Sequence, residues 1–335
     1  MSINKALYIL NQNGVVAFPT ETVYGLGAKI DSDEALKKIF STKERPFFDP
    51  LIVHVDTTDK AKACFKHWNP VADCLAQNFW PGPLTIVMEK SDLISDVITS
   101  GLPSVGVRIP HHPVALELLQ KIKIPLAAPS ANKFGKTSPT SAAHVKKEFL
   151  ETVYVLESDI PCQIGIESTV LLVRKNLEIS ILRLGLIVKS EIEKILIQNK
   201  VSYQWNETID KKESPGHMKH HYMPEIPFVI CRNPHMKVKD VGQIVDQRLS
   251  RLPAEIEGVK ILKPTKPIGK IEFLKLAGTP QQAAREIYSQ LRLASERKPD
   301  LLCLALLKDY STGPDAEKWD SVLDRLYKAA SLVID

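Results

Sequence analysis

The 335-residue sequence lacks the features that would place it in a specialised class of protein. Its five cysteines are scattered, odd in number and without a CxxC pair, which excludes a disulfide scaffold and argues against a structural zinc site. No apolar run approaches the roughly 20 residues of a membrane-spanning helix. The N-terminus has no secretory signal pattern. We therefore expect a cytoplasmic soluble protein with no membrane partner.

The sequence also lacks a strong charge imbalance. It has 44 Lys and Arg residues and 39 Asp and Glu residues, which gives a net charge of +5. The length corresponds to about two domains at roughly 150 residues each. Residues 101–150 carry a local excess of the same size, with seven basic and two acidic side chains. Such a window is either a solvated face, the commoner case, or a site for an anion such as a nucleotide or RNA phosphate.

Hydrophobic patterning divides the chain into three parts. Residues 1–198 alternate strand-like runs with helical stretches and include a hairpin around residues 174–177, which predicts a mixed α/β or α+β sheet. Residues 199–226 are polar, contain a Ser-Pro-Gly breaker at 214–216, and read as a linker longer than the ~15 residues of compact connections. Residues 227–335 resume the alternation and predict a small α/β domain.

Three helices have clear sequence signals. Asn69 followed by Pro70 predicts a helix start, and the Pro-Gly-Pro run after Trp80 ends that helix. Thr279 before Pro280 opens a long helix to about residue 297. Apolar residues at helical spacing predict a final helix over 316–332.

Generic catalytic signatures fail. Gly25-Leu26-Gly27 begins a dinucleotide fingerprint, but Ile30 stands at its third glycine position. Gly135-Lys136-Thr137 resembles the end of a phosphate-binding loop, but Ser130 replaces the glycine required five residues earlier. The histidines at 217, 220 and 221 have no nearby carboxylate or cysteine, which favours a structural or surface role over metal binding.

Polar residues at the ends of predicted strands instead indicate one ligand cleft. Residues 19–27, 43–46, 49–54 and 129–132 place Thr, Lys, Arg, His, Ser and Asn beside apolar runs, and Arg108 lies within an apolar strand. Each position also has a simpler explanation as a turn, a cap or a helix terminus. Loops that follow strands are where α/β sheets bind ligands, so together they predict a site.

The same stretches resemble the threonylcarbamoyl-AMP synthases, whose catalytic part is a YrdC-like domain. The matching motifs are FPTETVYGLG (18–27), KERP with DPLIVH (43–54), FWPGPLT (79–85), SVGVRIP (104–110), APSANKFG (128–135), SPT (138–140), IESTV (166–170) and ILRLG (181–185). SPGHMKHHYMP (214–224) is similar to the linker of the two-domain form, and the C-terminal part ending in DRLYKAAS (324–331) fits that form as well.

The resemblance implies a YrdC-like twisted mixed sheet with flanking helices over residues 1–198. It implies a lid over the active site at residues 199–226. A small Rossmann-like α/β domain is implied for residues 227–335. The linker departs from the family pattern at residues 217–219, where the family usually has a methionine followed by basic and aromatic residues.

The implied activity is that of a nucleotidyltransferase, an enzyme that joins L-threonine, bicarbonate or CO₂ and ATP into threonylcarbamoyl-AMP and releases pyrophosphate. A separate tRNA threonylcarbamoyl transferase complex would use the product to modify the adenosine beside the anticodon. Mg²⁺ would arrive with ATP, and no organic cofactor is expected. One alternative is a non-catalytic protein of the same fold that binds double-stranded RNA or tRNA. Another is carbamoyl transfer in hydrogenase maturation, which normally belongs to a much longer chain.

Site residues follow from the resemblance position by position. Threonine contacts are implied at Thr22, His54, Arg108, Ala128 and Ser168. ATP contacts are implied at Arg45, Asp49, Ser104, Ser130, Asn132, Ser138, Arg183 and Tyr222. Lys43 and His54 are the candidate catalytic residues, no general base is identified, and no protein metal ligand is assigned. Asp49 stands where the family pattern leads us to expect asparagine, and its carboxylate would repel a triphosphate unless Mg²⁺ or Lys43 lay between them.

Overall fold

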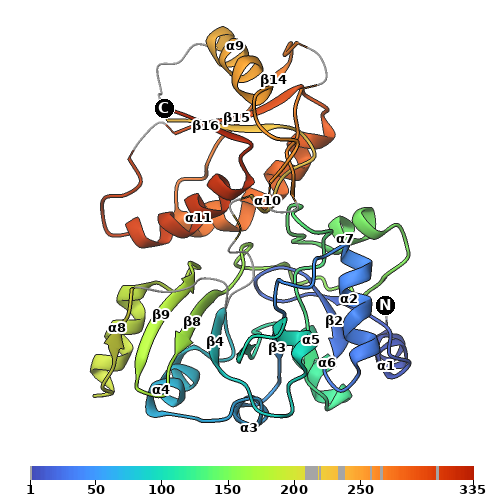
Figure 1. Ribbon diagram of the computed structural model, residues 1–335, viewed down its shortest axis with the longest axis vertical. Helices are drawn as coiled ribbons and strands as arrows, with labels where there is room; N and C mark the ends of the chain where they lie inside the picture. The colour runs from blue at the N-terminus through green and yellow to red at the C-terminus, as the bar shows by residue number, and fades with distance from the viewer. Residues whose placement is uncertain are drawn as a thin grey trace. The chain divides into compact units, whose positions relative to one another are not determined.

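The computed structural model describes residues 2–207, 218, 220–232, 238–256, 259–264, 267–306 and 309–335 (Figure 1). The chain forms two compact units, and we describe each by itself. The first unit comprises Met1–Lys133 and Pro139–His217, and the second comprises Phe134–Ser138 and Met218–Asp335. A five-residue segment from the middle of the chain therefore belongs to the second unit. The domain boundaries expected from the sequence stay a prediction.

The described part of the first unit contains a ten-stranded mixed sheet in the order β10-β9-β8-β4-β5-β3-β6-β2-β1-β7. Its central strands combine parallel pairs, β3 with β5 and β4 with β8, and antiparallel pairs, β4 with β5 and β8 with β9. This mixture confirms the predicted fold class and the predicted hairpin. The strands are β1 (Val16–Phe18), β2 (Gly25–Lys29), β3 (Ile52–His54), β4 (Leu84–Glu89), β5 (Ser104–Arg108), β6 (Leu126–Ala127), β7 (Tyr154–Val155), β8 (Thr169–Val173), β9 (Glu178–Arg183) and β10 (Gln204–Trp205).

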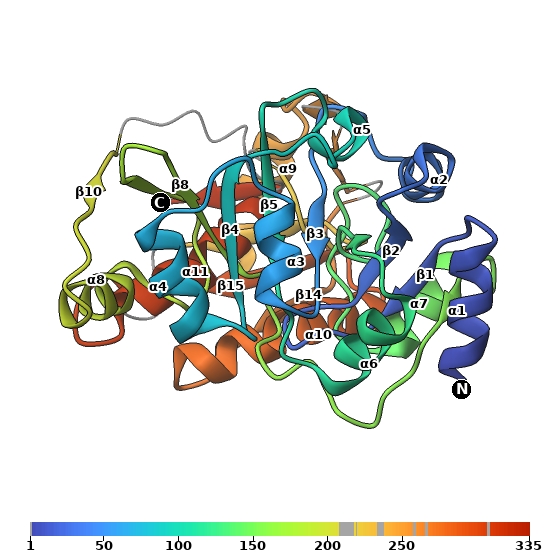
Figure 2. The same ribbon diagram turned by 90° about the horizontal axis from the view of Figure 1, so that it is seen from below.

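Seven of the eight helices described in the first unit begin at a residue whose side chain accepts from a free backbone N–H, and at the start of α8 Glu191 accepts from Val188 N instead. Asn69 Oδ1 accepts from Ala72 N at 2.9 Å, which confirms the predicted helix start. Figure 2 shows α1, α6 and α7 toward the β1 end of the sheet and α4 and α8 toward the β10 end. The helices are α1 (Ile3–Asn11), α2 (Asp33–Lys43), α3 (Thr58–Ala63), α4 (Pro70–Phe79), α5 (Asp96–Thr99), α6 (Pro113–Ile122), α7 (Ala142–Phe149) and α8 (Lys189–Gln198).

The two faces of the central strands differ in chemistry because successive side chains of a strand point to opposite faces. Val53, Ile86 and Val107 belong to the main hydrophobic core, together with apolar residues of α3 and α4. Their chain neighbours His54 and Arg108 therefore point to the opposite face. On β3 and β5 that face carries His54, Ser104 and Arg108, three of the polar residues singled out by the motifs.

The second unit has a four-stranded parallel sheet among its described residues, in the order β14-β15-β11-β16. Its strands are β11 (Phe228–Cys231), β14 (Ile271–Leu274), β15 (Leu301–Ala305) and β16 (Leu332–Ile334), and a separate hairpin joins β12 (Glu255–Ile256) to β13 (Val259–Lys260). Helix α9 (Val238–Leu249) lies on one side of the sheet, and α10 (Pro280–Glu296) and α11 (Ala316–Ala329) lie on the other (Figure 1).

The long helix expected after Thr279 is confirmed as α10, but the final helix is shorter than predicted. Helix α11 ends at Ala329, and Leu332–Ile334 pairs with β11 as a parallel strand. Ser331 N donates to Phe228 O at 2.7 Å at the start of this pairing. The apolar C-terminal residues thus complete a sheet edge, a long-range contact that helical periodicity does not report.

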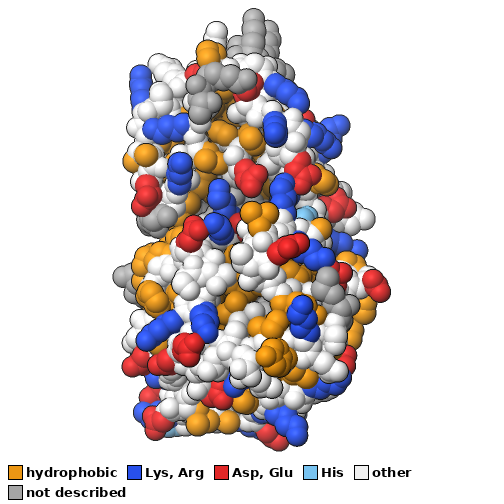
Figure 3. Space-filling model, turned by 90° about the vertical axis from the view of Figure 1, so that its right-hand side faces the viewer, with side chains coloured by type: hydrophobic (Ala, Val, Ile, Leu, Met, Phe, Trp, Pro, Cys, Tyr) orange, Lys and Arg blue, Asp and Glu red, His pale blue; other side chains and the backbone are white. Residues whose placement is uncertain are grey.

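The basic window at residues 101–150 is mostly a solvated face. Lys121 pairs with Glu117 at 2.7 Å, and Lys133 pairs with Glu44 at 2.6 Å. These lysine side chains are 48% and 42% exposed, so the pairs contribute little to stability. Figure 3 shows Lys and Arg side chains interspersed with Asp and Glu on the face in view. Arg108 differs from these lysines because it is only 4% exposed.

Gly185 gives a test of the packing at the start of β8, where its backbone lies against Thr169. A Cβ atom there would lie 2.3 Å from Thr169 N and 2.6 Å from Thr169 Oγ1, so the backbone would have to move. We expect Gly185→Ala to lower the free energy of unfolding by about 3 kcal/mol, measured by guanidinium denaturation. Gly278→Ala is the matched control, because no atom lies within 4 Å of its added Cβ. An unchanged midpoint for Gly185→Ala would contradict the described contact.

Candidate functional site

The site is organised around the guanidinium of Arg108, the last residue of β5. Its Nε donates to His54 Nε2 at 3.0 Å, and its Nη1 donates to Glu21 Oε1 at 3.1 Å. Its Nη2 donates to the hydroxyls of Thr20 at 3.1 Å and Thr22 at 3.0 Å. All five side chains are buried. The loop between β1 and β2 thus meets the ends of β3 and β5 at one point.

His54 is held as a neutral ring. Its Nδ1 lies 3.1 Å from Ile52 O, a partner that only accepts, so Nδ1 carries the hydrogen. Its Nε2 then accepts from Arg108. Burial, and next the positive charge of Arg108, hold the pKa of His54 well below its usual value. Both ring nitrogens therefore have fixed partners within the protein.

Glu21 is a buried partner of Arg108 that the sequence interpretation missed. Its carboxylate is 3% exposed, and its Oε2 accepts from the backbone N–H of His111 at 2.9 Å while Oε1 receives Arg108. The available signal was an acidic residue between two threonines in an otherwise apolar stretch. A buried carboxylate needs a cation or several donors, so that position could have been paired with Arg108 in advance.

A second arginine lies on the same side of the sheet. Arg183 Nε donates to Ser168 O at 3.1 Å and its Nη2 donates to Ser168 Oγ at 3.1 Å. Ser168 Oγ is 2.8 Å from Thr85 Oγ1 on β4. Burial lowers the pKa of Arg108, Glu21 opposes this shift, and the charge of Arg183 adds to it. Two buried cations that act on each other form a site suited to an anion.

Lys43 secures the loop that carries Ser130 and Asn132. Its Nζ donates to Ser130 O at 2.6 Å and also to Asn132 O. Burial, and next the charge of Arg45, place the pKa of Lys43 well below its usual value, against the opposing effects of Glu148 and Asp49. Both contacts of Lys43 Nζ are with backbone carbonyls of the loop at residues 130–132. They hold this loop beside β2, where Ser130 forms a bridge with Gly25.

Arg45 and Asp49 form a buried pair in the loop between α2 and β3. Arg45 Nη2 lies 2.8 Å from Asp49 Oδ2, and the two side chains are 4% and 0% exposed. Arg45 Nε and Nη2 also donate to Asp49 O, at 3.1 and 3.0 Å, and Nη2 donates to Pro50 O at 2.9 Å. Arg45 thus balances the negative charge of Asp49, which the sequence analysis expected to repel a triphosphate.

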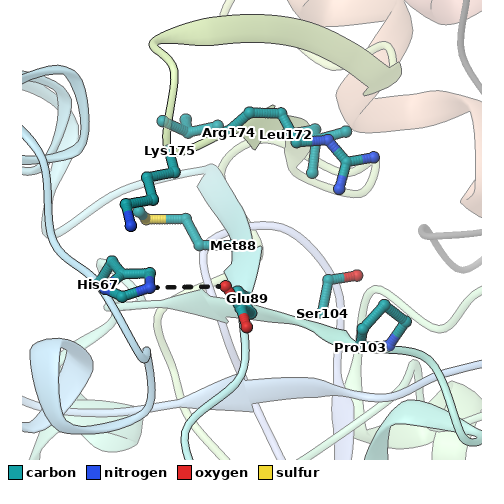
Figure 4. Close-up of a pocket in the computed structure, with 9 residues that line it drawn as sticks. His67, Met88, Glu89, Pro103, Ser104, Leu172, Arg174 and Lys175 are labelled. Carbon is teal, nitrogen blue, oxygen red and sulfur yellow. Dashed lines mark ion pairs between the residues drawn. The ribbon is translucent and has the colours of Figure 1, made fainter.

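Ser104 marks the opposite end of β5 from Arg108, roughly 13 Å away at about 3.3 Å per strand residue. It lines a cavity of about 230 Å³ together with His67, Met88, Glu89, Pro103, Leu172, Val173, Arg174 and Lys175. Figure 4 shows Arg174 and Lys175, from the β8–β9 turn, across the cavity from Ser104 and Glu89. His67 Nε2 lies 3.7 Å from Glu89 Oε2.

The remaining predicted residues fall in different places. Ala128 follows β6, donates its N–H to Ile52 O at 2.9 Å, and is buried. Ser138 and Tyr222 belong to the second unit, where Thr137 Oγ1 donates to Tyr222 O at 3.0 Å. The breaker at 214–216 and the histidine at 217 lie outside the described residues. The site assignments as ligand contacts stay predictions.

No group of three or more His, Cys, Asp or Glu side chains among the residues that the structure describes is arranged to hold a metal ion. None of the helices described there has the length and apolar character needed to cross a membrane.

Comparisons with known proteins first define the class. Residues 8–185 match the family model of Sua5, YciO and YrdC proteins, whose description is "Telomere recombination". Residues 187–331 match a second model, described as "Threonylcarbamoyl-AMP synthase, C-terminal domain". The first match covers more than half of the chain, so this is a YrdC-type protein with an additional C-terminal domain.

Individual relatives then identify the family. A threonylcarbamoyl-AMP synthase of Pyrococcus abyssi is 33% identical over 98% of this chain and 94% of its own length. One of Bacillus subtilis is 35% identical over 98% of this chain and 92% of its own length. The crystal structure of P. abyssi Sua5 complexed with L-threonine aligns with a TM-score of 0.79 at 30% identity, covering 99% of this chain and 96% of that one. The chain belongs to the threonylcarbamoyl-AMP synthase family, as the motifs predicted.

His54 gives a prediction about pH. Its pKa in the folded protein lies below the ordinary value of about 6.5, so only the unfolded chain takes up a proton as the pH falls through that value. The free energy of unfolding should therefore decrease below about pH 6.5. His54→Gln should reduce this slope by up to about 1.4 kcal/mol per pH unit, measured by denaturation between pH 5 and 7.

The comparison uses the slope, not the absolute stability, so a general destabilisation of the variant does not obscure it. His112, whose pKa is also lowered chiefly by burial, contributes in the same direction and remains in both proteins. Equal slopes for the wild type and His54→Gln would show that His54 is not buried as a neutral ring.

Proposed function

We propose that this chain synthesises threonylcarbamoyl-AMP from L-threonine, bicarbonate or CO₂ and ATP, with release of pyrophosphate. The observation that carries the proposal is the pair of buried guanidiniums, Arg108 and Arg183, set among hydroxyl groups on one face of the sheet. Membership of the synthase family and the likeness to a structure complexed with L-threonine support it. The relatives named above are synthases, so they lend no support to a non-catalytic RNA-binding role.

Threonine is proposed to bind at the Arg108 end of β5. Its contacts would be Thr22, Arg108, Ala128 and Ser168, and His54 is the fifth residue that the resemblance assigns to this site. His54 acts through Arg108 in this proposal, because both of its ring nitrogens are already engaged. We therefore assign His54 a positioning role and not that of a general base. Lys43 is likewise a positioning residue, since its Nζ donates to the carbonyls of Ser130 and Asn132.

ATP is proposed to extend along β5 toward Ser104 and its cavity. Arg45, Asp49, Ser104, Ser130, Asn132, Ser138, Arg183 and Tyr222 would contact it. Mg²⁺ would enter bound to the ATP phosphates and would neutralise part of their charge. The strand places Ser104 and Arg108 on one face, so a nucleotide and an amino acid lying end to end could meet between them.

The proposed reaction has two steps. The neutral amine of threonine attacks the carbon of CO₂, and the nitrogen loses a proton to give a carbamate. With bicarbonate the same step also expels hydroxide, which takes up that proton and leaves as water. A carbamate oxygen then attacks the α-phosphorus of ATP, the bond to the β-phosphate oxygen breaks, and pyrophosphate leaves. Arg183 and Arg45 would stabilise charge on the phosphates in place of water. Because a carbamate decomposes in water, closure of the site by residues 199–226 is part of the proposal.

The product would pass to a separate tRNA threonylcarbamoyl transferase complex, which transfers the threonylcarbamoyl group to adenosine beside the anticodon. We propose the cytoplasm as the location. All five cysteines are free thiols and are buried, which suits a reducing compartment.

The deciding experiment measures pyrophosphate release with ATP, threonine and bicarbonate, omitting each in turn. We expect release only when all three are present, and mass spectrometry should detect threonylcarbamoyl-AMP. Turnover that continues without threonine would refute the proposal. Serine in place of threonine is a suitable control for amino-acid specificity.

Asp49 gives a prediction on nucleotide affinity. Its carboxylate offsets the charge of Arg45 at 2.8 Å, so Asp49→Asn leaves more positive charge for the phosphates. We expect the KM for ATP to fall by about fivefold, with the KM for threonine unchanged, in the pyrophosphate assay. Asp73→Asn is the control, because it alters a carboxylate on α4 that accepts from Trp68 Nε1. A raised KM for ATP would contradict the expected effect of the Asp49 charge and would show that the carboxylate favours nucleotide binding.

A further inference from the structure

We propose that Glu21 is a positioning residue for threonine recognition, because it holds Arg108 in the one orientation that leaves a donor for the substrate carboxylate. This inference rests on the proposed function. Glu21 was not among the residues that the motifs assigned to threonine or to ATP. Its case depends on the hydrogen-bonding capacity of the groups that surround Arg108.

Four of the five N–H donors of the Arg108 guanidinium are already engaged within the protein. A guanidinium carries five N–H groups. Nε uses its hydrogen on His54, and Nη2 uses both of its hydrogens on Thr20 and Thr22. Nη1 gives one hydrogen to Glu21. One Nη1 hydrogen remains for a ligand, so Arg108 offers the substrate a single donor and not a bidentate pair.

The hydrogen bonds of the Thr20 and Thr22 hydroxyls also have a fixed donor and acceptor. Thr20 Oγ1 donates its only hydrogen to Val23 O at 2.6 Å. In the contact of 2.9 Å between Thr20 Oγ1 and Thr22 Oγ1, the donor must then be Thr22. Thr22 Oγ1 also accepts from Arg108, which leaves it one free lone pair. Thr22 therefore presents an acceptor to the substrate, suited to an amine or hydroxyl hydrogen.

The remaining donor of Arg108 and the remaining acceptor of Thr22 together determine how the substrate is oriented. A carboxylate oxygen fits the remaining Nη1 hydrogen of Arg108, and an amino or hydroxyl hydrogen fits Thr22. An L-amino acid with a hydroxyl side chain carries all three groups. If Arg108 rotated, its remaining hydrogen would point elsewhere and the contacts to both threonines would break. The orientation of the guanidinium therefore determines which way round the amino acid lies.

Glu21 is the group that fixes this orientation from the Nη1 side. Its Oε1 accepts a hydrogen bond from Arg108 Nη1, and its Oε2 accepts one from His111 N at 2.9 Å, so both oxygens serve as acceptors. Glutamine has the same shape but only one acceptor oxygen. In a Glu21→Gln variant the amide nitrogen would face either Arg108 or the His111 N–H, and one contact must be lost.

The backbone of this loop is held independently of the carboxylate. Ile164 N donates to Glu21 O at 2.8 Å, and Gly165 N donates to Thr22 O at 3.2 Å. Tyr24 N donates to Pro139 O at 2.9 Å. We therefore expect the loop to keep its conformation when only the side chain of Glu21 is changed. The effect should fall on Arg108 and on what Arg108 binds.

The test compares Glu21→Gln with Glu191→Gln. Glu191 Oε2 accepts a backbone N–H, from Val188, at the start of α8, so the control makes the same chemical change away from this face. For Glu21→Gln we expect the KM for threonine and the Kd from calorimetry with L-threonine alone to rise on the order of 10- to 100-fold. The KM for ATP should stay within about twofold of wild type.

A purely structural role gives a different result. Partial unfolding lowers the active fraction and hence kcat, but leaves both KM values and the Kd unchanged. Glu21→Asp, which keeps the charge on a shorter side chain, should give a smaller rise, and it replaces the glutamine variant if that variant does not fold.

The outcomes separate this inference from the proposed function. An unchanged KM and Kd for threonine in Glu21→Gln, with normal wild-type turnover, would overturn the role of Glu21 alone. Failure of the wild type to bind threonine or to need it for pyrophosphate release would overturn the proposed function instead.

Discussion

The burial of the Arg108 guanidinium is the constraint on which the site depends. A buried cation must be supplied with acceptors, because its hydration is lost. Here the acceptors come from the β1–β2 loop and from the end of β3, with Glu21 providing the opposite charge. Each contributing segment is fixed by the sheet, so the cation and its partners hold one another in a defined arrangement without a ligand.

Two other buried basic residues of the first unit follow the same rule. Lys43 donates to two carbonyls of the loop at Ser130 and Asn132, and Arg45 is balanced by Asp49 and by backbone carbonyls. These contacts fix the loops around the sheet before any substrate arrives. Preorganised polar groups of this kind stabilise developing charge without rearrangement during the reaction. The proposal that His54 and Lys43 are positioning residues rests on these contacts.

Much of the fold followed from local chemistry. Asn69 before Pro70 and Thr279 before Pro280 predicted helices that the structure contains, because capping and the fixed φ of proline act within a few residues. The final helix was predicted too long, since the pairing of Leu332–Ile334 with β11 joins segments about 100 residues apart. The inclusion of residues 134–138 in the second unit has the same origin: Met223 N donates to Gly135 O at 2.8 Å, which no local pattern reveals.

The sequence by itself determined the family, the mixed sheet and the list of candidate residues, because each motif is a short run whose residue types can be read directly. Only the tertiary structure decided what those residues touch. It showed that His54 has no free nitrogen, that Lys43 binds carbonyls, and that Glu21 is the counter-charge of Arg108. The reason is physical: the donors and acceptors of a buried cation are brought together by strand pairing across 54 to 88 residues of chain, and hydrogen-bonding capacity can be counted only when all partners are in place.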